Sequence, residues 1–392
     1  REAASESPSL SYTDEEVQAV VAHIKELPNV ATVDSPADAM EALQEMGVYP
    51  RVQFTEPTDT ILTISRDDAE NGIYYTFAYN FKFAVNEGDP ATTTVLSIEG
   101  EGQPYFIDDW TGKVTKAGEY EIRDGRTYVE VSLLPGEAAL MALDMEETPA
   151  THAVSTTADE AFIEDGAGMI LATASGEYET VLDNGETVST AIEVPEAISL
   201  PVWDITIEDW NEGDKVVNTE EKFGHTTTEV YYTTKKTELS FPQSELVTWK
   251  DLSATEEQLA TLTTASGADP SMAQVSGIGT YTTTFELPEG WTDANGAYLQ
   301  IGSTNGSIVQ VFVNGEKAPG VDTRTLRTDI SDLLVEGENT IEVRLATTLT
   351  NRMIERNYQD NDSRWTDEFP TVQDYGMTGE VSIVPYTVAQ VF

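Results

Sequence analysis

One segment near the end of the chain combines side chains that could bind a small polar ligand. Residues 347–369 are irregular in pattern and rich in Asn, Arg, Tyr, Asp and Trp. Amide and guanidinium groups offer paired donors and acceptors for hydroxyl groups, and an aromatic ring covers the C–H face of a sugar. An ordered loop packed against a neighbouring domain is the competing interpretation. We predict a carbohydrate or interdomain contact surface formed by Asn351, Arg352, Tyr358, Trp365 and Asp374.

The sequence offers little for metal binding or catalysis. Asp360-Asn-Asp362 could help to hold a structural calcium ion through oxygen ligands, but the glycine and the terminal glutamate of a calcium loop are missing. The three histidines, His23, His152 and His225, have no spacing typical of a metal site or a catalytic triad. Glycoside hydrolysis uses paired carboxylates, and 70 Asp and Glu residues do not nominate one pair. We therefore predict no catalytic residue, no metal site and no cofactor other than such a calcium ion.

The charge balance limits the class of partner. The 392 residues include 21 Lys and Arg against 70 Asp and Glu, a formal net charge of −49. Such a field repels nucleic acid and anionic membranes and favours neutral ligands. No apolar run reaches the ~18 residues that a membrane helix needs, so we expect no membrane insertion. The absence of cysteine excludes disulfides and thiolate chemistry.

The last half of the chain has the alternation of a β-sandwich. The valines of residues 309–313 occupy alternate positions on a strand that runs into Asn314-Gly315, the residues of a two-residue hairpin turn. Residues 338–345 alternate in the same way, and residues 226–239 add a Thr-rich hairpin. We predict a mainly β fold with a sandwich domain over residues 200–392, in which a loop at a strand end carries the candidate surface.

Two further regions precede this domain. Strands recur about every ten to fifteen residues, with turn signals such as Asn71-Gly72 between them, so we predict a first β-sandwich over residues 51–199. Residues 1–50 predict two helices and one short strand, with Thr13 and Glu16 as a capping box. This unit is too small to form a parallel sheet alone, and we interpret it as the α/β remnant of an upstream domain.

Five short sequence segments of the second sandwich follow one another in the order found in a known domain family. They are Gly279–Tyr281, Ala297–Gly302, Val311–Gly315, Asp329–Leu334 and Gly337–Val343. The series resembles the galactose-binding-like jelly roll that family 2 glycoside hydrolases and family 106 α-L-rhamnosidases carry as a sugar-binding module. The resemblance implies a jelly-roll fold for this domain.

The region around the first sandwich carries a second resemblance. Leu43–Pro50, Tyr74–Asn80, Asp109–Gly112 and Leu134–Glu137 follow one another as in the region just after the catalytic barrel of family 106 rhamnosidases. In those enzymes the catalytic carboxylates lie on the upstream barrel, and no residue of this chain aligns with them. The resemblance implies the non-catalytic C-terminal region of a large bacterial glycoside hydrolase, whose partner is the upstream catalytic domain of the same chain.

We expect this region to support the barrel and to contact a plant or host oligosaccharide. The expected location is extracellular or on the bacterial cell surface, with a cytoplasmic location as the alternative. Two other hypotheses stay open: a surface adhesion or structural protein whose sandwiches serve as spacers, and a hydrolase whose carboxylates lie within these residues. The sequence begins at Arg1 without Met, so we expect it to be a piece of a longer protein.

Overall fold

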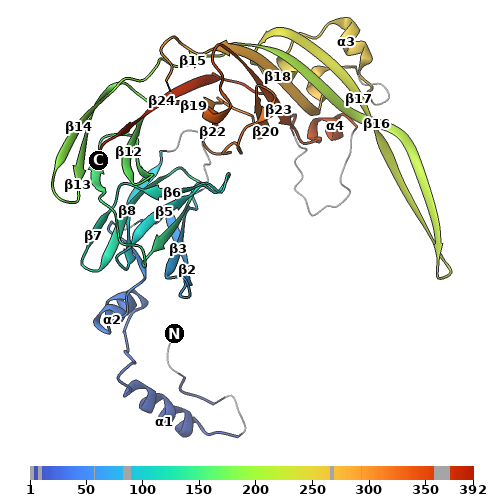
Figure 1. The fold of residues 1–392 in the computed structure, drawn as a ribbon. Helices are drawn as coiled ribbons and strands as arrows, with labels where there is room; N and C mark the ends of the chain where they lie inside the picture. The colour runs from blue at the N-terminus through green and yellow to red at the C-terminus, as the bar shows by residue number, and fades with distance from the viewer. Residues whose placement is uncertain are drawn as a thin grey trace.

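The fold is mainly β, and each sheet consists of antiparallel strands. The computed structural model describes residues 4–7, 11–56, 58–82, 90–264, 269–292, 294–356 and 371–392. These residues form an arch, with two N-terminal helices near one end and a long two-stranded arm at the other (Figure 1). The predicted mainly β fold with sandwich domains is confirmed.

The N-terminal helices bury none of their side chains. They are α1 (Asp14–Lys25), the 3-10 turn η1 (Pro36–Asp38) and α2 (Ala39–Glu45). The predicted capping box is present, because Thr13 Oγ1 accepts from Glu16 N and the Glu16 carboxylate accepts from Thr13 N. The short strand predicted in this region is wrong: within residues 11–50 no strand is formed.

The next region consists of two layers. One is a four-stranded sheet in the order β1 (Val52–Phe54), β4 (Thr92–Glu99), β8 (Arg126–Leu133) and β7 (Glu121–Arg123). The other layer begins with β2 (Ile61–Asp68), β3 (Ile73–Asn80), β9 (Ala138–Asp144), β5 (Gln103–Ile107) and β6 (Val114–Ala117). Both layers contribute apolar side chains to one core, which includes Leu96, Ile98, Val129, Met141 and Leu143.

This second layer continues into the C-terminal half of the chain as one eleven-stranded sheet. From β6 it passes through β11 (Glu160–Glu164), β12 (Ala167–Ala172), β24 (Ser382–Gln390), β19 (Asn295–Gln300) and β22 (Arg327–Asp329), and β15 (Ile198–Ser199) pairs with β24. A separate sheet contains β10 (Ala153–Thr156), β13 (Gly176–Leu182) and β14 (Thr187–Ile192). Strand β24 thus joins the two halves, and the predicted division after residue 199 stays a prediction.

The C-terminal sandwich is completed by a six-stranded sheet. Its order is β17 (His225–Glu245), β16 (Val202–Lys222), β18 (Gly277–Glu286), β23 (Glu338–Ala346), β20 (Ile308–Val313) and β21 (Glu316–Lys317). The core between this sheet and strands β24, β19 and β22 of the eleven-stranded sheet includes Trp203, Tyr281, Leu299, Val343 and Ile383, all at most 1% exposed. Short helical turns lie around this core: η2 (Trp249–Asp251), α3 (Glu256–Thr261), η3 (Met272–Gln274), η4 (Ser331–Leu333) and α4 (Thr350–Glu355).

The alternation on β20 is as the sequence predicts. Val311 and Val313 are buried, and the strand ends in a turn at Asn314 (φ 52°) and Gly315 (φ 84°). Two successive residues with positive φ are the geometry of a two-residue hairpin turn. The Asn314-Gly315 hairpin is therefore confirmed.

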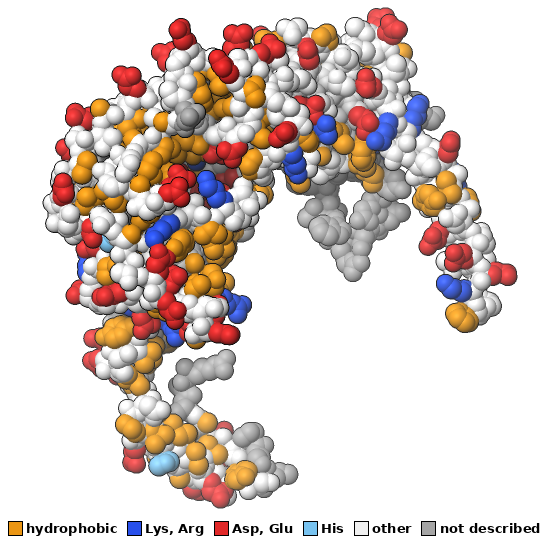
Figure 2. All heavy atoms as spheres, in the orientation of Figure 1, with side chains coloured by type: hydrophobic (Ala, Val, Ile, Leu, Met, Phe, Trp, Pro, Cys, Tyr) orange, Lys and Arg blue, Asp and Glu red, His pale blue; other side chains and the backbone are white. Residues whose placement is uncertain are grey.

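The outer parts of β16 and β17 form a ribbon that leaves the body of the protein (Figure 1). We call residues 212–236 the arm. No residue of the arm is buried, and Phe223 at its tip is 96% exposed. Acidic side chains are spread over the visible face of the molecule (Figure 2). In the part of the chain that the structure describes, no helix has the length and apolar character to span a membrane.

Candidate functional site

Two of the five predicted binding residues lie on α4, and both are buried. Asn351 is 3% exposed and Arg352 is 5% exposed. Helix α4 follows β23 at one end of the C-terminal sandwich and contacts η3. The segment begins after a strand end, as predicted, but Thr350–Glu355 form a helix, so the predicted irregular loop is wrong for these residues. Asn351 and Arg352 face the protein interior, whereas Leu349 and Met353 are 43% and 42% exposed.

Arg352 forms a buried ion pair inside the domain. Its Nη2 donates to both carboxylate oxygens of Asp209 on β16, at 2.9 and 2.8 Å, and its Nη1 donates to Glu355 Oε2 at 3.2 Å. The side chain of Asp209 is fully buried. Burial raises the pKa of Asp209, and the charge of Arg352 opposes that rise without cancelling it.

A second arginine extends this cluster to the root of the arm. Arg356 Nη2 donates to Asn211 Oδ1 at 2.8 Å, and its Nη1 lies 3.6 Å from Glu212 Oε2. Arg356 Nε lies 3.3 Å from Glu355 Oε2. We call Asp209, Arg352, Glu355 and Arg356 the arm-root cluster. It joins α4 to β16 at the point where the arm leaves the sheet, which fixes the arm relative to the body.

Asn351 and Asp374 hold the two ends of the segment that contains the other candidates. Asn351 Nδ2 donates to Gln373 O at 2.9 Å, and Gln373 N donates back to Asn351 Oδ1 at 2.7 Å. Asp374 is exposed and forms an ion pair with Lys250. Tyr358 and Trp365 lie outside the described residues, as does the possible calcium site at Asp360-Asn-Asp362. Asn351 is thus hydrogen-bonded to Gln373, the residue that directly precedes Asp374.

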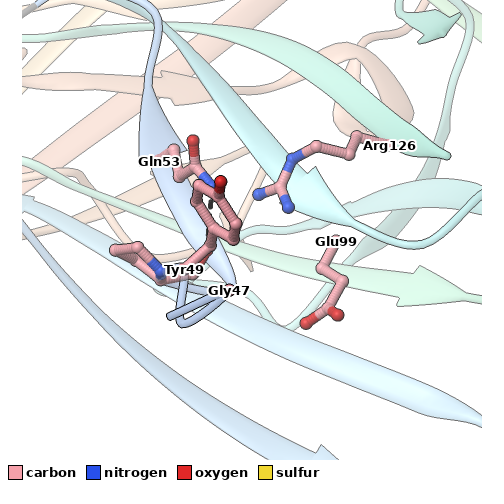
Figure 3. Close-up of a pocket in the computed structure, with 6 residues that line it drawn as sticks. Gly47, Tyr49, Gln53, Glu99 and Arg126 are labelled. Carbon is pink, nitrogen blue, oxygen red and sulfur yellow. Dashed lines mark hydrogen bonds between the residues drawn. The ribbon is translucent and has the colours of Figure 1, made fainter. Parts of the chain in front are cut away.

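Sequence reasoning missed an open hollow beside the first sandwich. It has a volume of about 380 Å³ and is lined by Gly47, Tyr49, Pro50, Gln53, Glu99 and Arg126. Tyr49 and Gln53 lie on one side, the Arg126 guanidinium points toward them, and Glu99 lies below (Figure 3). Arg126 donates to Ser97 Oγ and Ser97 O, both at 2.7 Å. These groups could hold a small polar ligand, but Arg126 and Glu99 lie on different strands and no local motif marks them.

Metal binding finds no support in the described part of the chain. Across those ranges, no three His, Asp or Glu side chains are grouped so that they could hold an ion. His152 is instead buried against Tyr120, with ring centroids 3.7 Å apart, and its Nδ1 lies 2.8 Å from Ala150 O. This histidine has a packing role.

Comparison with known proteins finds similar folds among solved structures. No family model and no curated protein matches the sequence. The structure is similar to a rhamnosidase from Novosphingobium sp. PP1Y, with a TM-score of 0.55 and 19% identity over 95% of this chain and 28% of that chain. A β-D-glucuronidase from Dictyoglomus thermophilum matches with a TM-score of 0.26 and 15% identity over 50% of this chain and 29% of that one.

An α-L-rhamnosidase from Aspergillus terreus also matches, with a TM-score of 0.22 and 10% identity over 83% of this chain and 27% of that one. The chain therefore spans less than a third of the length of each of these three enzymes. The fold is a set of antiparallel β-sandwiches that is similar to part of the Novosphingobium rhamnosidase structure.

Proposed function

We propose that this chain is an accessory region of a glycoside hydrolase, which supports a catalytic barrel upstream in the same polypeptide. The carrying observation is the likeness to the Novosphingobium rhamnosidase, which extends over 95% of this chain but only 28% of the enzyme. We propose that the enzyme is of the family 106 or family 2 type and that residues 200–392 form a galactose-binding-like jelly roll. An extracellular or cell-surface location in a bacterium goes with this role.

The unburied apolar face of the N-terminal helices supports an upstream partner domain. Val20 and Ile24 on α1 are 59% and 44% exposed, and Met40 and Leu43 on α2 are 54% and 43% exposed. Amphipathic helices normally bury such a stripe against another element. We propose that residues 1–50 complete the upstream domain, so that these side chains contact its core.

The arrangement of the buried carboxylates supports a non-catalytic role. Asp209 and Glu355 are both ion-paired with Arg352 and shielded from solvent. A glycosidase needs two carboxylates that face a sugar ring across a cleft. The arm-root cluster therefore has the character of a structural ion-pair network.

Turnover of a panel of aryl glycosides by the purified 392-residue protein tests this point. We expect no turnover above that of a heat-denatured sample. Glu137 and Asp109 are the carboxyl groups to replace, because desolvation raises the pKa of both and both interact electrostatically with Asp322. Turnover that Glu137→Gln or Asp109→Asn abolishes would instead favour the hydrolase hypothesis.

We further propose that the segment between Asn351 and Asp374 contacts carbohydrate. In this proposal Asn351 and Arg352 are positioning residues, since both are buried, whereas Tyr358, Trp365 and Asp374 provide the contact surface. The proposal predicts retention of the protein on at least one glycan of a broad array and loss of retention in Trp365→Ala. Trp110→Ala is the matched control, because Trp110 is 44% exposed on the first sandwich. Retention that both variants lose equally, or no retention at all, contradicts it and leaves scaffolding or a spacer role in an adhesion protein.

A further inference from the structure

The arm has an exposed strand edge that nothing in the described chain covers. In the six-stranded sheet β17 is the outermost strand, and it pairs only with β16. Every residue of β17 from His225 to Lys236 is exposed. Open edges present unpaired N–H and C=O groups, and a two-stranded ribbon alone is only marginally stable in water.

The outer part of β17 lacks the side chains that normally protect an edge, and the bulge of the arm lies on β16, between Glu212 and Lys215. Residues Thr226–Thr234 have the sequence TTTEVYYTT, with one charged residue, Glu229, and no Lys, Pro or Gly. The facing strand is different, because residues 212–222 of β16 contain six charged side chains. Proteins usually blunt an exposed edge with Lys, Pro or a bulge. Both edges of the arm are unpaired, because β18 pairs with β16 only at Asp204–Asp209, and β17 is the edge with fewer charged side chains.

We propose that Thr226–Thr234 pairs antiparallel with the same segment of a second copy of this chain, so that two arms form one four-stranded sheet about a twofold axis. Two identical strands related by a twofold make the same residue face itself at the axis. With Val230 at the axis, Glu229 lies opposite Tyr231 of the second copy, and Thr228 lies opposite Tyr232. The segment pairs along its full length and no two charges of one sign meet.

Side-chain packing across the arm favours this register. Val230 pairs with Val217 of β16 within one copy, so these two side chains share a face of the ribbon. They are 51% and 54% exposed, and Tyr232 on the same face is 47% exposed. Pairing two arms places Val217 and Val230 of each copy in one row across four strands. That row buries apolar surface that the single arm leaves in water.

A shift by one residue would place Glu229 at the axis. Two identical carboxylates would then lie directly opposite each other, which destabilises a strand pair. The same sequence therefore selects Val230 as the central residue.

The position of the arm reduces the electrostatic cost of association. Each copy has a formal net charge of −49, and two bodies in contact would repel each other. The arm projects the contact away from the bodies (Figure 1), and at physiological salt the repulsion is screened beyond about 8 Å. The arm-root cluster holds the arm in place through the contact of Arg356 with Asn211 at 2.8 Å. We expect added salt to strengthen the dimer.

A single engineered cysteine tests the register, because the natural sequence has none. In Val230→Cys the two thiols would face each other across the axis, within reach of a disulfide. Mild oxidation is expected to convert this variant to a covalent dimer on non-reducing gels. In Thr226→Cys the two thiols would be about 27 Å apart, at ~3.4 Å per residue, and the variant is expected to stay monomeric on the same gel. Equal cross-linking of the two variants would overturn the proposal.

Analytical ultracentrifugation of the natural 392-residue protein tests the association itself. We expect a concentration-dependent dimer whose dissociation constant rises at least tenfold in Val230→Lys, because two ammonium groups then meet at the axis. Ile308→Lys is the matched control, since Ile308 is 70% exposed on β20, away from the arm. Unchanged thermal melts of both variants would show that the fold is intact. A protein that stays monomeric at all concentrations, or that forms open-ended polymers, contradicts the proposal.

Discussion

Arg352 on α4 binds both carboxylate oxygens of Asp209 on β16, at 2.9 and 2.8 Å, although 143 positions separate the two residues in the sequence. Both side chains are almost fully shielded from solvent. The pair connects the segment after β23 to the strand that carries the arm. Arg352, whose guanidinium group could bind sugar hydroxyls, instead fixes α4 on β16.

Removing Arg352 alone should strongly destabilise the protein. In Arg352→Met the buried carboxylate of Asp209 loses its partner, and we expect a loss of about 3 to 5 kcal/mol in the free energy of unfolding. Arg344→Met is the control, because Arg344 pairs with Glu342 at the surface and such pairs contribute at most about 1 kcal/mol. Urea denaturation measures both. Equal losses in the two variants would show that the buried pair has no special weight.

The same pair predicts a rescue. Replacement of both partners by apolar residues, in Asp209→Leu with Arg352→Met, removes both charges of this pair, while Glu355 keeps Arg356 as a partner. Such double replacements are often neutral or stabilising. We expect the double variant to recover most of the stability that Arg352→Met loses. A double variant that is less stable than the single one would contradict the ion-pair explanation.

Tyr281 should make the protein sensitive to alkali. Burial raises the pKa of its phenol from near 10 to about 12, with hydrogen bonds from Met377 N and Trp249 Nε1 opposing the rise. The unfolded chain loses this proton near pH 10 and the folded chain only near pH 12, so stability is complete below pH 10 and falls as pH rises through that window. At 1.36 kcal/mol per unit the loss approaches about 2.7 kcal/mol.

Urea denaturation between pH 8 and pH 12 measures this effect. Tyr281→Phe should be less stable at pH 8 by about 1 to 3 kcal/mol, because the buried Trp249 N–H loses its acceptor. Its stability should also fall less between pH 10 and pH 12 than that of the natural protein. Parallel pH curves for the two proteins would assign the alkaline loss to other groups.

Any side chain at Gly277 should destabilise the protein. Its φ is +148°, and an added Cβ would lie 2.1 Å from the backbone oxygen of Glu208 on the adjacent strand. Backbone strain and overpacking together should cost about 2 to 6 kcal/mol in Gly277→Ala. Gly337→Ala is the control, because Gly337 also has positive φ but no atom within 4 Å of the added Cβ. We expect about 1 to 2 kcal/mol there. Thermal unfolding of both variants checks the order.

Local patterns predicted the parts of the fold that local physics decides. The alternation in residues 309–313 placed Val311 and Val313 in the core, and Asn314-Gly315 made the expected hairpin. The Thr-rich hairpin predicted at residues 226–239 is wrong, because these residues form one strand, β17, and the turn that joins it to β16 lies at Phe223-Gly224. The β-branched and aromatic residues of 226–234 indicate a strand, but no local signal shows how far that strand runs beyond the sheet.

The long-range contacts could not be read from the sequence. Arg352 was predicted as a binding residue because its type suits sugar hydroxyls, and nothing near it in the chain reveals Asp209. The pairing of β12 with β24 joins Leu171 to Val388 and crosses the predicted domain division. Such pairings depend on how preformed layers meet, so only the three-dimensional structure provides them.

The central claim is that this region packs against a catalytic domain in the same polypeptide, and hydrogen exchange on α1 tests it most directly. The measurement compares peptides spanning Asp14–Lys25 in the 392-residue protein and in the proposed longer polypeptide. We predict fast exchange in the 392-residue protein, because no residue of α1 is buried there, and at least a hundredfold slower exchange in the longer polypeptide. Equal exchange in the two proteins would contradict the account.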